Sequence, residues 1–205
     1  MALVKYNNNS LSSVTSAAGF PAGALTHIKT LTASSSSNLS FVHGSSDVVL
    51  DSTYPIYVFK FINMHPADND ADFQFNMTTD SGSNYNVTKT TTLFRSLNHE
   101  SDSTASVSYQ TGGDLAQSTS GQRLTKNMKN ANDDAMSGIV RLFNPSSTTF
   151  VKHFMTQTSS TTYHPYIFHD IVAGYGNTTS AIDAVQFEPS SGTIDSGTIT
   201  LYGIR

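Results

Sequence analysis

The sequence contains no cysteine, and this absence excludes three kinds of chemistry. Disulfide bonds, zinc sites built on cysteine thiolates and thiol nucleophiles all need a residue that the 205-residue chain lacks. Charge is also scarce, because only 13% of the residues are charged, whereas an ordinary soluble protein has about 25%. Fifteen acidic against eleven basic residues give a net charge of −4, with no basic cluster that could neutralise phosphates. We therefore expect no nucleic acid among the partners.

Long apolar runs are missing as well. No stretch reaches the roughly 18 apolar residues that indicate a membrane-spanning helix. The opening segment, MALVKYNNNSLSSVTSAAGF, also lacks the apolar core of a signal peptide. We expect no insertion into a membrane and a mature chain that begins at or near Met1.

Strand-forming segments, by contrast, fill most of the chain. Residues 54–64, YPIYVFKFINM, are apolar at nearly every position and predict a strand buried on both faces. Residues 72–77, DFQFNM, alternate strictly, which places Phe73, Phe75 and Met77 on one face. We expect these two segments to pair as a hairpin. Residues 198–203 alternate too, and predict a strand paired inside a sheet.

About nine or ten such segments follow one another at a spacing of roughly 10 to 18 residues, and none has the pattern of a three-turn helix. This organisation predicts an all-β fold, an antiparallel two-sheet β-sandwich of the jelly-roll kind. Residues 1–23 are small and polar, with a break at Phe20-Pro21, and predict an extended N-terminal arm; residues 24–205 then form a single β-sandwich domain. The polar stretch 97–135 is expected to be an exposed excursion.

Metal-binding patterns are weak. The string DNDAD places Asp68, Asp70 and Asp72 at alternate positions, as at the start of a calcium loop, but the glycine and the terminal glutamate of that loop are missing. The three acids are therefore a weak calcium candidate or the solvated tip of a turn. Histidines occur singly, and His153 and His169 lie on expected strands where they could meet across a sheet. We expect no cofactor and no metal.

Catalytic patterns are equally weak. The sequence has no G-x-S-x-G elbow and no evident pair of catalytic carboxylates. Asp183, Glu188 and Asp195 are expected to lie within reach of one another at one end of the sandwich, and a glycan-cleaving depolymerase that uses such acids stays open as an alternative. Our main expectation is that the protein is not an enzyme.

Tyrosines near polar turns are the better candidates for ligand contact. Tyr109, Tyr163 and Tyr166 lie in or beside such turns, where a ring with a hydroxyl group can stack on a sugar or fill a protein interface. The alternative is that these rings only cap the ends of the sandwich.

Five long strings cover much of the chain from about residue 25: "YVFKFINMHPADNDADFQFNMTTDSGSNYNVTKTTTLFR", "DLAQSTSGQRL", "SGIVRLFNPSSTTFVKHFM", "VAGYGNTTSAIDAVQF" and "SSGTIDSGTITLYGI". These strings resemble blocks of a group of short virion structural proteins of marine tailed bacteriophages, including cyanophage-like viruses. The resemblance implies a protein located in the virion after assembly in the host cytoplasm, and it supplies no catalytic residue. It implies either a tail-fibre or tail-tip module or, as an alternative, a capsid decoration protein.

Several partners follow from this implied role. A module of this kind is expected to contact other virion proteins and to form a homo-oligomer, most simply a homotrimer, because ring closure hides sheet edges. A tail-associated member would also contact host-surface glycan through the loops near 97–135 and 159–166.

Overall fold

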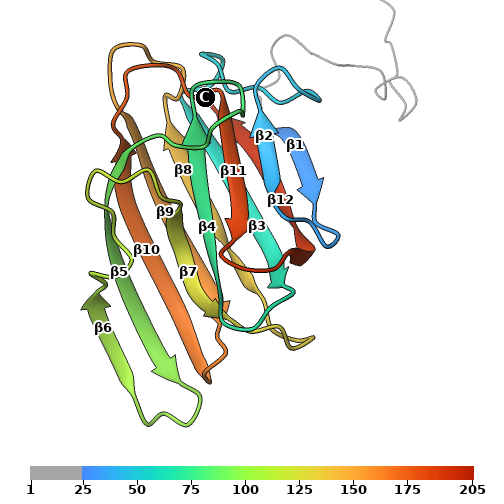
Figure 1. Ribbon diagram of the computed structural model, residues 1–205, viewed down its shortest axis with the longest axis vertical. Coiled ribbons are helices and arrows are strands. Elements are labelled where there is room, and N and C mark those ends of the chain that lie inside the picture. Colours follow the sequence, from blue (N-terminus) through green and yellow to red (C-terminus); the bar gives the residue numbers. More distant parts are fainter. Residues whose placement is uncertain (1–24) are drawn as a thin grey trace, which may run out of the picture.

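The computed structural model describes residues 25–205, and every regular element in this range is a β-strand (Figure 1). The strands form one sheet of eight and one sheet of four, and all neighbouring strands are antiparallel. The predicted antiparallel two-sheet sandwich is therefore confirmed. The predicted arm, residues 1–23, lies outside the described residues. Residues 25–205 contain no helix long and apolar enough to cross a lipid bilayer.

The large sheet contains, in spatial order, β1 (Thr26–Thr32), β12 (Ile194–Ile204), β3 (Ile56–Pro66), β8 (Met136–Phe143), β9 (Lys152–Thr161), β10 (Tyr166–Gly176), β5 (Lys89–His99) and β6 (Ala105–Tyr109). The small sheet contains β2 (Leu39–Val42), β11 (Ala184–Pro189), β4 (Ala71–Thr78) and β7 (Gln122–Met128).

Eight of these strands have the connectivity of a jelly roll. The order β1-β12-β3-β8 in one sheet faces β2-β11-β4-β7 in the other. Along these eight strands the chain changes sheet at every step except from β4 to β7. Two hairpins are inserted into this frame: β5–β6 follows β4, and β9–β10 follows β8. Together they continue the large sheet as β9-β10-β5-β6, which we call the extension. Figure 1 shows β5 and β6 beyond the edge of the small sheet.

The expected hairpin of residues 54–64 and 72–77 is wrong. The two segments form β3 and β4, which lie in different sheets. Their apolar faces meet across the sandwich, and the rings of Phe61 and Phe73 lie 5.9 Å apart. Alternation indicates that one face is buried, but it does not indicate whether the partner strand lies beside that face or opposite it.

The polar stretch 97–135 is only in part an excursion. It contains β6, which is exposed at every residue, but also β7, whose Leu124 and Met128 are buried in the core. A strand with two apolar residues has too weak a pattern to stand out in a polar sequence.

Phenylalanine rings form the centre of the jelly-roll core. Phe187 in β11 is fully buried, and five other rings lie around it with centroid distances of 5.0 to 6.4 Å. These rings belong to Phe41, Phe59, Phe61, Phe73 and Phe75, from strands of both sheets. Each buried ring contributes about 2 to 3 kcal/mol from the removal of apolar surface from water. The two sheets are therefore held together mainly by this cluster.

The inner face of the extension is mixed, because buried charged and polar side chains lie there beside Leu93, Phe154, Phe168 and Val172. Four charged residues are fully buried within residues 25–205, and all of them point inward from the extension: Lys89, Arg95, Lys152 and Asp170. The segment 110–121 and β7 cover this face. Thr91 donates from its hydroxyl to Gln122, and Thr158 donates to the backbone carbonyl of Leu124. The extension is thus attached to the rest of the molecule by these hydrogen bonds and by Leu93, Phe154 and Val172, which belong to the hydrophobic core.

Arg95 and Asp170 form a buried ion pair within the extension. They lie directly opposite one another on β5 and β10, and Nε and one terminal nitrogen of Arg95 each donate to a carboxylate oxygen of Asp170 at 2.7 Å. The Arg95 guanidinium also stacks 3.8 Å from the centre of the Phe168 ring. Two parallel charge-assisted hydrogen bonds fix this pair in the register of the two strands.

Candidate functional site

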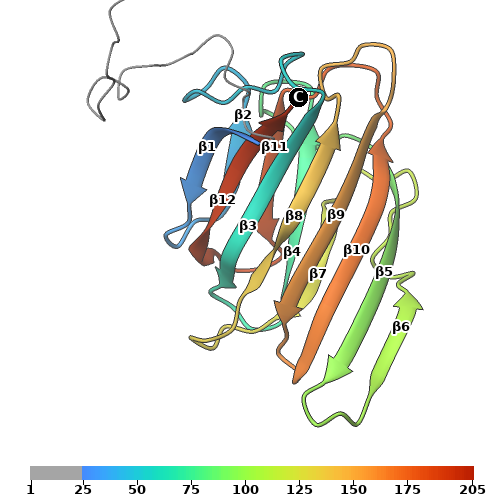
Figure 2. The ribbon, with the colours of Figure 1, turned by 180° about the vertical axis from the view of Figure 1, so that it is seen from behind.

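The large sheet has one face that points away from the small sheet, and Figure 2 looks onto it. In the extension this face carries the side chains that alternate with the buried ones on β5, β6, β9 and β10. We call it the outer face. Its residues are Ala105, Val107 and Tyr109 of β6; Thr90, Thr92, Phe94, Ser96 and Asn98 of β5; Ile167, His169, Ile171, Ala173 and Tyr175 of β10; and His153, Met155, Gln157, Ser159 and Thr161 of β9.

The outer face is partly apolar, and the described residues leave its apolar side chains exposed. Large apolar side chains that are 41% to 78% exposed gather on it: Phe94, Val107, Tyr109, Met155, Ile167 and Ile171. None of the outer-face residues is Asp, Glu, Lys or Arg. Exposed apolar side chains that stand alone need no explanation, but a contiguous group on a monomer indicates a contact surface.

Tyr109 belongs to this surface. It lies opposite Phe94 in the β5–β6 pair, and the two rings meet edge to face with centroids 5.2 Å apart. Its hydroxyl donates to Asp114 at 2.6 Å, and this hydrogen bond raises the pKa of Tyr109. Ile171 continues the same row on β10. Tyr109, Phe94 and Ile171 therefore form a row of aromatic and aliphatic side chains across β6, β5 and β10.

Shallow hollows lie between the apolar rows. One is lined by Ser96, Asn98, Ile167 and His169, and a neighbouring one by Gln157, Ser159 and His169 together with Ser137 and Ile139 of β8. Gln157 donates from Nε2 to Nε2 of His169 at 3.0 Å. The polar groups of the outer face are therefore hydroxyls, amides and imidazoles, which can exchange hydrogen bonds with a neutral partner.

His153 and His169 share the outer face but do not meet. His153 lies opposite Tyr175, with ring centroids 6.1 Å apart, whereas His169 lies opposite Ser159 and contacts Gln157. The two histidines therefore take part in different hollows.

Tyr163 and Tyr166 form a second aromatic group, at the turn between β9 and β10. Tyr163 is 50% exposed, and its ring lies 5.4 Å from that of His164. Tyr166 lies opposite His99, with ring centroids 4.8 Å apart, and it stacks on Phe168. We call Tyr163 and Tyr166 the turn aromatics.

The structure does not bring Tyr109 to the turn aromatics. Tyr109 pairs with Phe94, and Tyr166 pairs with His99, five positions further along β5. At about 3.3 Å per residue this separates the two pairs by roughly 16 Å. Tyr166 also points to the inner side of the sheet with Phe168, while Tyr109 belongs to the outer face. The three predicted tyrosines thus serve two separate surfaces.

The acids of the DNDAD string are held by protein groups. Asp70 accepts a hydrogen bond from the Asn127 side chain, and Asp72 accepts one from the Asn127 backbone while it pairs with Arg123 at 3.6 Å. Asp68 lies beside Gly192. Residues 25–205 contain no group of three or more His, Cys, Asp or Glu side chains placed to hold a metal ion. We propose no calcium site.

The expectation that Asp183 lies within reach of Glu188 is wrong. Asp183 precedes β11 and accepts from the backbone of Ser81, whereas Glu188 near the far end of β11 accepts from Gln74. Five residues of strand separate them by roughly 16 Å, beyond the roughly 5 to 9.5 Å between the carboxylates of glycosidases. Asp195 on β12 accepts from Ser35 instead. Asp183 and Glu188 are therefore too far apart to act as a glycosidase pair.

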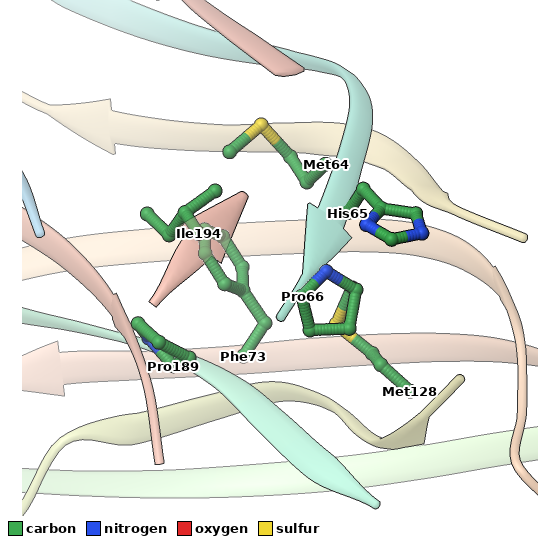
Figure 3. Close-up of a pocket in the computed structure, with 7 residues that line it drawn as sticks. All are labelled: Met64, His65, Pro66, Phe73, Met128, Pro189 and Ile194. Carbon is green, nitrogen blue, oxygen red and sulfur yellow. The ribbon is translucent and has the colours of Figure 1, made fainter. Parts of the chain in front are cut away.

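A small apolar hollow lies at one end of the sandwich (Figure 3). Its lining is Met64, His65, Pro66, Phe73, Met128, Pro189 and Ile194. His65 is the one residue among them with a polar side chain, and its Nε2 is already hydrogen-bonded to the backbone carbonyl of Ala131 at 3.0 Å. This hollow is a packing feature of the core rather than a ligand site.

The sequence contains a pattern that distinguishes the outer face, but the usual interpretation of that pattern assigns the face to the wrong side of the strands. On β5, β9 and β10 the charged residues occupy one set of alternate positions, and the exposed apolar residues occupy the other. A strand face with charged residues is ordinarily predicted to point to solvent. This pattern therefore predicts that the charged residues are exposed and the apolar ones buried, whereas the structure has these charged residues buried and these apolar residues exposed. Comparison of the chain with protein-family models, with curated proteins and with solved structures gives no match.

Proposed function

We propose that the chain is a structural protein of a bacteriophage virion, a tail-associated module of the fibre or tip that contributes to assembly and to attachment at the host surface. The observation that carries the proposal is the outer face of the extension, an uncharged and partly apolar sheet surface. A surface of this kind is suited to contact with another macromolecule and has no use in small-molecule catalysis. The resemblance of five long strings to phage virion proteins supplies the setting.

The fold is compatible with this role by analogy. Jelly rolls occur in viral capsid and lectin domains, although a fold by itself does not establish a function. The inserted hairpins add to the jelly-roll frame a surface that the frame does not need for its own core. Such an addition supports a role in assembly.

Attachment is assigned to the turn aromatics. Tyr163 and Tyr166 lie with His99 and His164 at the end of the sheet where the β5–β6 and β9–β10 turns meet, and the backbone of Glu100 donates to the carbonyl of Pro165. Tyr163 is half exposed and Tyr166 is partly exposed, and such rings can stack on a sugar while their hydroxyls bind its polar groups. Host-surface glycan is therefore the proposed ligand at this end.

Electron microscopy of purified particles with a gold-labelled antibody against the chain tests the proposal. Labelling at the tail is the expected result. A regular pattern over the head would replace the tail assignment by capsid decoration, and intact particles without label would overturn the virion assignment. Antibody preabsorbed with purified protein is the control.

A second measurement tests the attachment part of the proposal. Purified protein should bind host cells and lose most of this binding in the double variant Tyr163→Ala, Tyr166→Ala, while the matched variant Tyr85→Ala, in the β4–β5 loop, should bind as the wild type does. Release of new sugar ends from host polysaccharide by the purified protein would contradict the non-enzymatic assignment.

A further inference from the structure

We infer that the outer face of the extension is an interface between copies of this chain. The inference rests on the proposed function for its biological setting, because it names the partner of the surface assigned to assembly. Three properties of the extension carry it: the placement of charge, the area of the face and the state of the free sheet edge.

Charge is placed so that two copies can meet at the outer face. The chain carries a net charge of −4, so two copies repel at most surfaces. In the extension, however, Lys89, Arg95, Lys152 and Asp170 all point inward, and none of the outward residues is an acid or a basic residue. The neighbouring strands β3 and β8 do carry charge on the same side of the sheet, at Lys60 and Arg141. An uncharged centre bordered by charged residues is the usual composition of a protein interface.

The area of the face reaches the lower limit for a specific contact. Four strands about 4.8 Å apart and about nine residues long, at about 3.3 Å per residue, cover roughly 19 Å by 30 Å. Two such faces in contact remove somewhat more than about 1,000 Å² of surface from water, which is the size that a specific interface requires. Exposed apolar side chains are spread over all four strands, at Val107, Phe94, Ile171 and Met155.

The free edge of the extension lacks the protection that the opposite edge has. β1, at the other end of the large sheet, carries Lys29 and a register shift between His27 and Lys29. Both features discourage pairing with a foreign strand. β6 has neither: it contains no charge and no proline, its pairing with β5 is regular, and all of its residues are exposed. An unprotected edge beside an apolar face is consistent with a region that a second copy of the chain shields.

Size-exclusion chromatography with light scattering tests the inference on the full chain. The expected mass is two or three times the 22.1 kDa of the chain, and it should fall towards the monomer on dilution. Phe94→Lys and Ile171→Lys place a charge at the centre of the outer face, and each should weaken association at least about tenfold. The matched control is Ile62→Lys, because Ile62 is 51% exposed on the large sheet but lies on β3, outside the extension.

A wild-type mass of one chain at all concentrations would overturn the inference. It would also be overturned if Phe94→Lys and Ile171→Lys stayed associated as the wild type does, since the interface would then lie elsewhere. Circular dichroism shows whether each variant is folded. Protection of β5, β6 and β10 amides against hydrogen exchange, lost on dilution of the wild type, provides a readout without any substitution.

Failure of this inference and failure of the proposed function are separate outcomes. Gold labelling of particles together with a monomeric mass would leave the virion role in place and assign the outer face to another virion protein or to glycan. An associated protein that never labels particles would keep the interface and remove the virion role.

Discussion

The jelly roll and the extension share one continuous sheet, but only the extension also buries charged residues in full among residues 25–205. In the jelly roll, Phe187 and its neighbours fill the space between the sheets, and polar side chains point to water. In the extension, Arg95, Asp170 and two lysines are buried, while Phe94 and Ile171 point to water. The comparison supports the proposed partner on the outer face of β5, β9 and β10, because exposed apolar side chains on strands alone in water gain nothing from this arrangement.

The comparison also separates the forces that hold the two regions. Burial of apolar surface stabilises the jelly roll. A buried ion pair, by contrast, contributes little net stability because removal of charge from water offsets the attraction, although the loss of one partner is strongly destabilising. The extension should therefore be sensitive to single changes and tolerant of paired ones.

The largest expected effect comes from the jelly roll. Deletion of residues 198–205 removes most of β12, which lies between β1 and β3 and contributes Ile199 and Leu201 to the core. We expect no soluble, cooperatively unfolding protein, as measured by expression of the soluble fraction and thermal unfolding. Deletion of Arg205 alone is the control and should change little. A truncated protein that unfolds cooperatively would show that β12 is dispensable.

Phe187→Ala should reduce the free energy of unfolding by about 3 to 5 kcal/mol, because it leaves a cavity at the centre of six rings. Phe94→Ala removes the same side-chain atoms from the outer face and should change the stability of the monomer by less than about 1 kcal/mol. Urea denaturation of both variants under dilute conditions measures the difference. Equal losses would erase the proposed contrast between the two regions.

Asp170→Asn should cost about 3 kcal/mol, because it leaves the Arg95 guanidinium buried without its countercharge. The double variant Arg95→Met, Asp170→Leu should recover most of this loss, since no uncompensated charge stays buried. The same denaturation measurement compares the two variants. If the double variant is as unstable as the single one, the hydrogen bonds of the pair are worth more than its desolvation penalty.

The smallest expected effect is a pH dependence from Lys89. Its Nζ donates to Asn76 and to the carbonyl of Val87, and no ion-pair partner is present among the described residues. Burial lowers the pKa of Lys89 from 10.5 to about 8. Between pH 8 and pH 10 the unfolded chain therefore binds more protons than the folded chain, and stability should rise with pH by about 2 kcal/mol.

Denaturation at pH 8 and at pH 10 measures this rise, and Lys89→Met should abolish most of it. Burial also lowers the pKa of Lys152, which adds a change of the same sign. Burial raises the pKa of Tyr57 to about 12, so that stability should fall again above about pH 10 as unfolded tyrosine loses its proton. Stability that falls from pH 8 to pH 10 would show that Lys89 is not penalised by burial.

Local pattern was enough to predict the fold class and several strands. The alternation of Phe73, Phe75 and Met77 and that of residues 198–203 follow from the two-residue period of a strand, which needs no knowledge of the partner. The pairing of β3 with β8 rather than with the segment that follows it could not be predicted, because pairing depends on contacts far apart in the sequence.

The candidate site was predicted less well, for a related reason. The sequence predicts Tyr109 as a contact residue, but its neighbours Phe94 and Ile171 come from other strands, and only the sheet order brings them beside it. Arg95 and Asp170 can both point inward because each neutralises the charge of the other. This pairing cannot be predicted from the sequence of either strand alone. Surfaces built across strands are visible only when the sheet order is known.

The two inserted hairpins have a practical consequence for engineering. The turn between β5 and β6, residues 100–104, is exposed and contains none of the phenylalanines of the core. The strand that follows it, β6, is exposed at every residue. Exposed turns of this kind accept inserted sequence with little effect on the frame. A peptide placed there would be displayed once per subunit, and the proposed association of copies would then make the display multivalent.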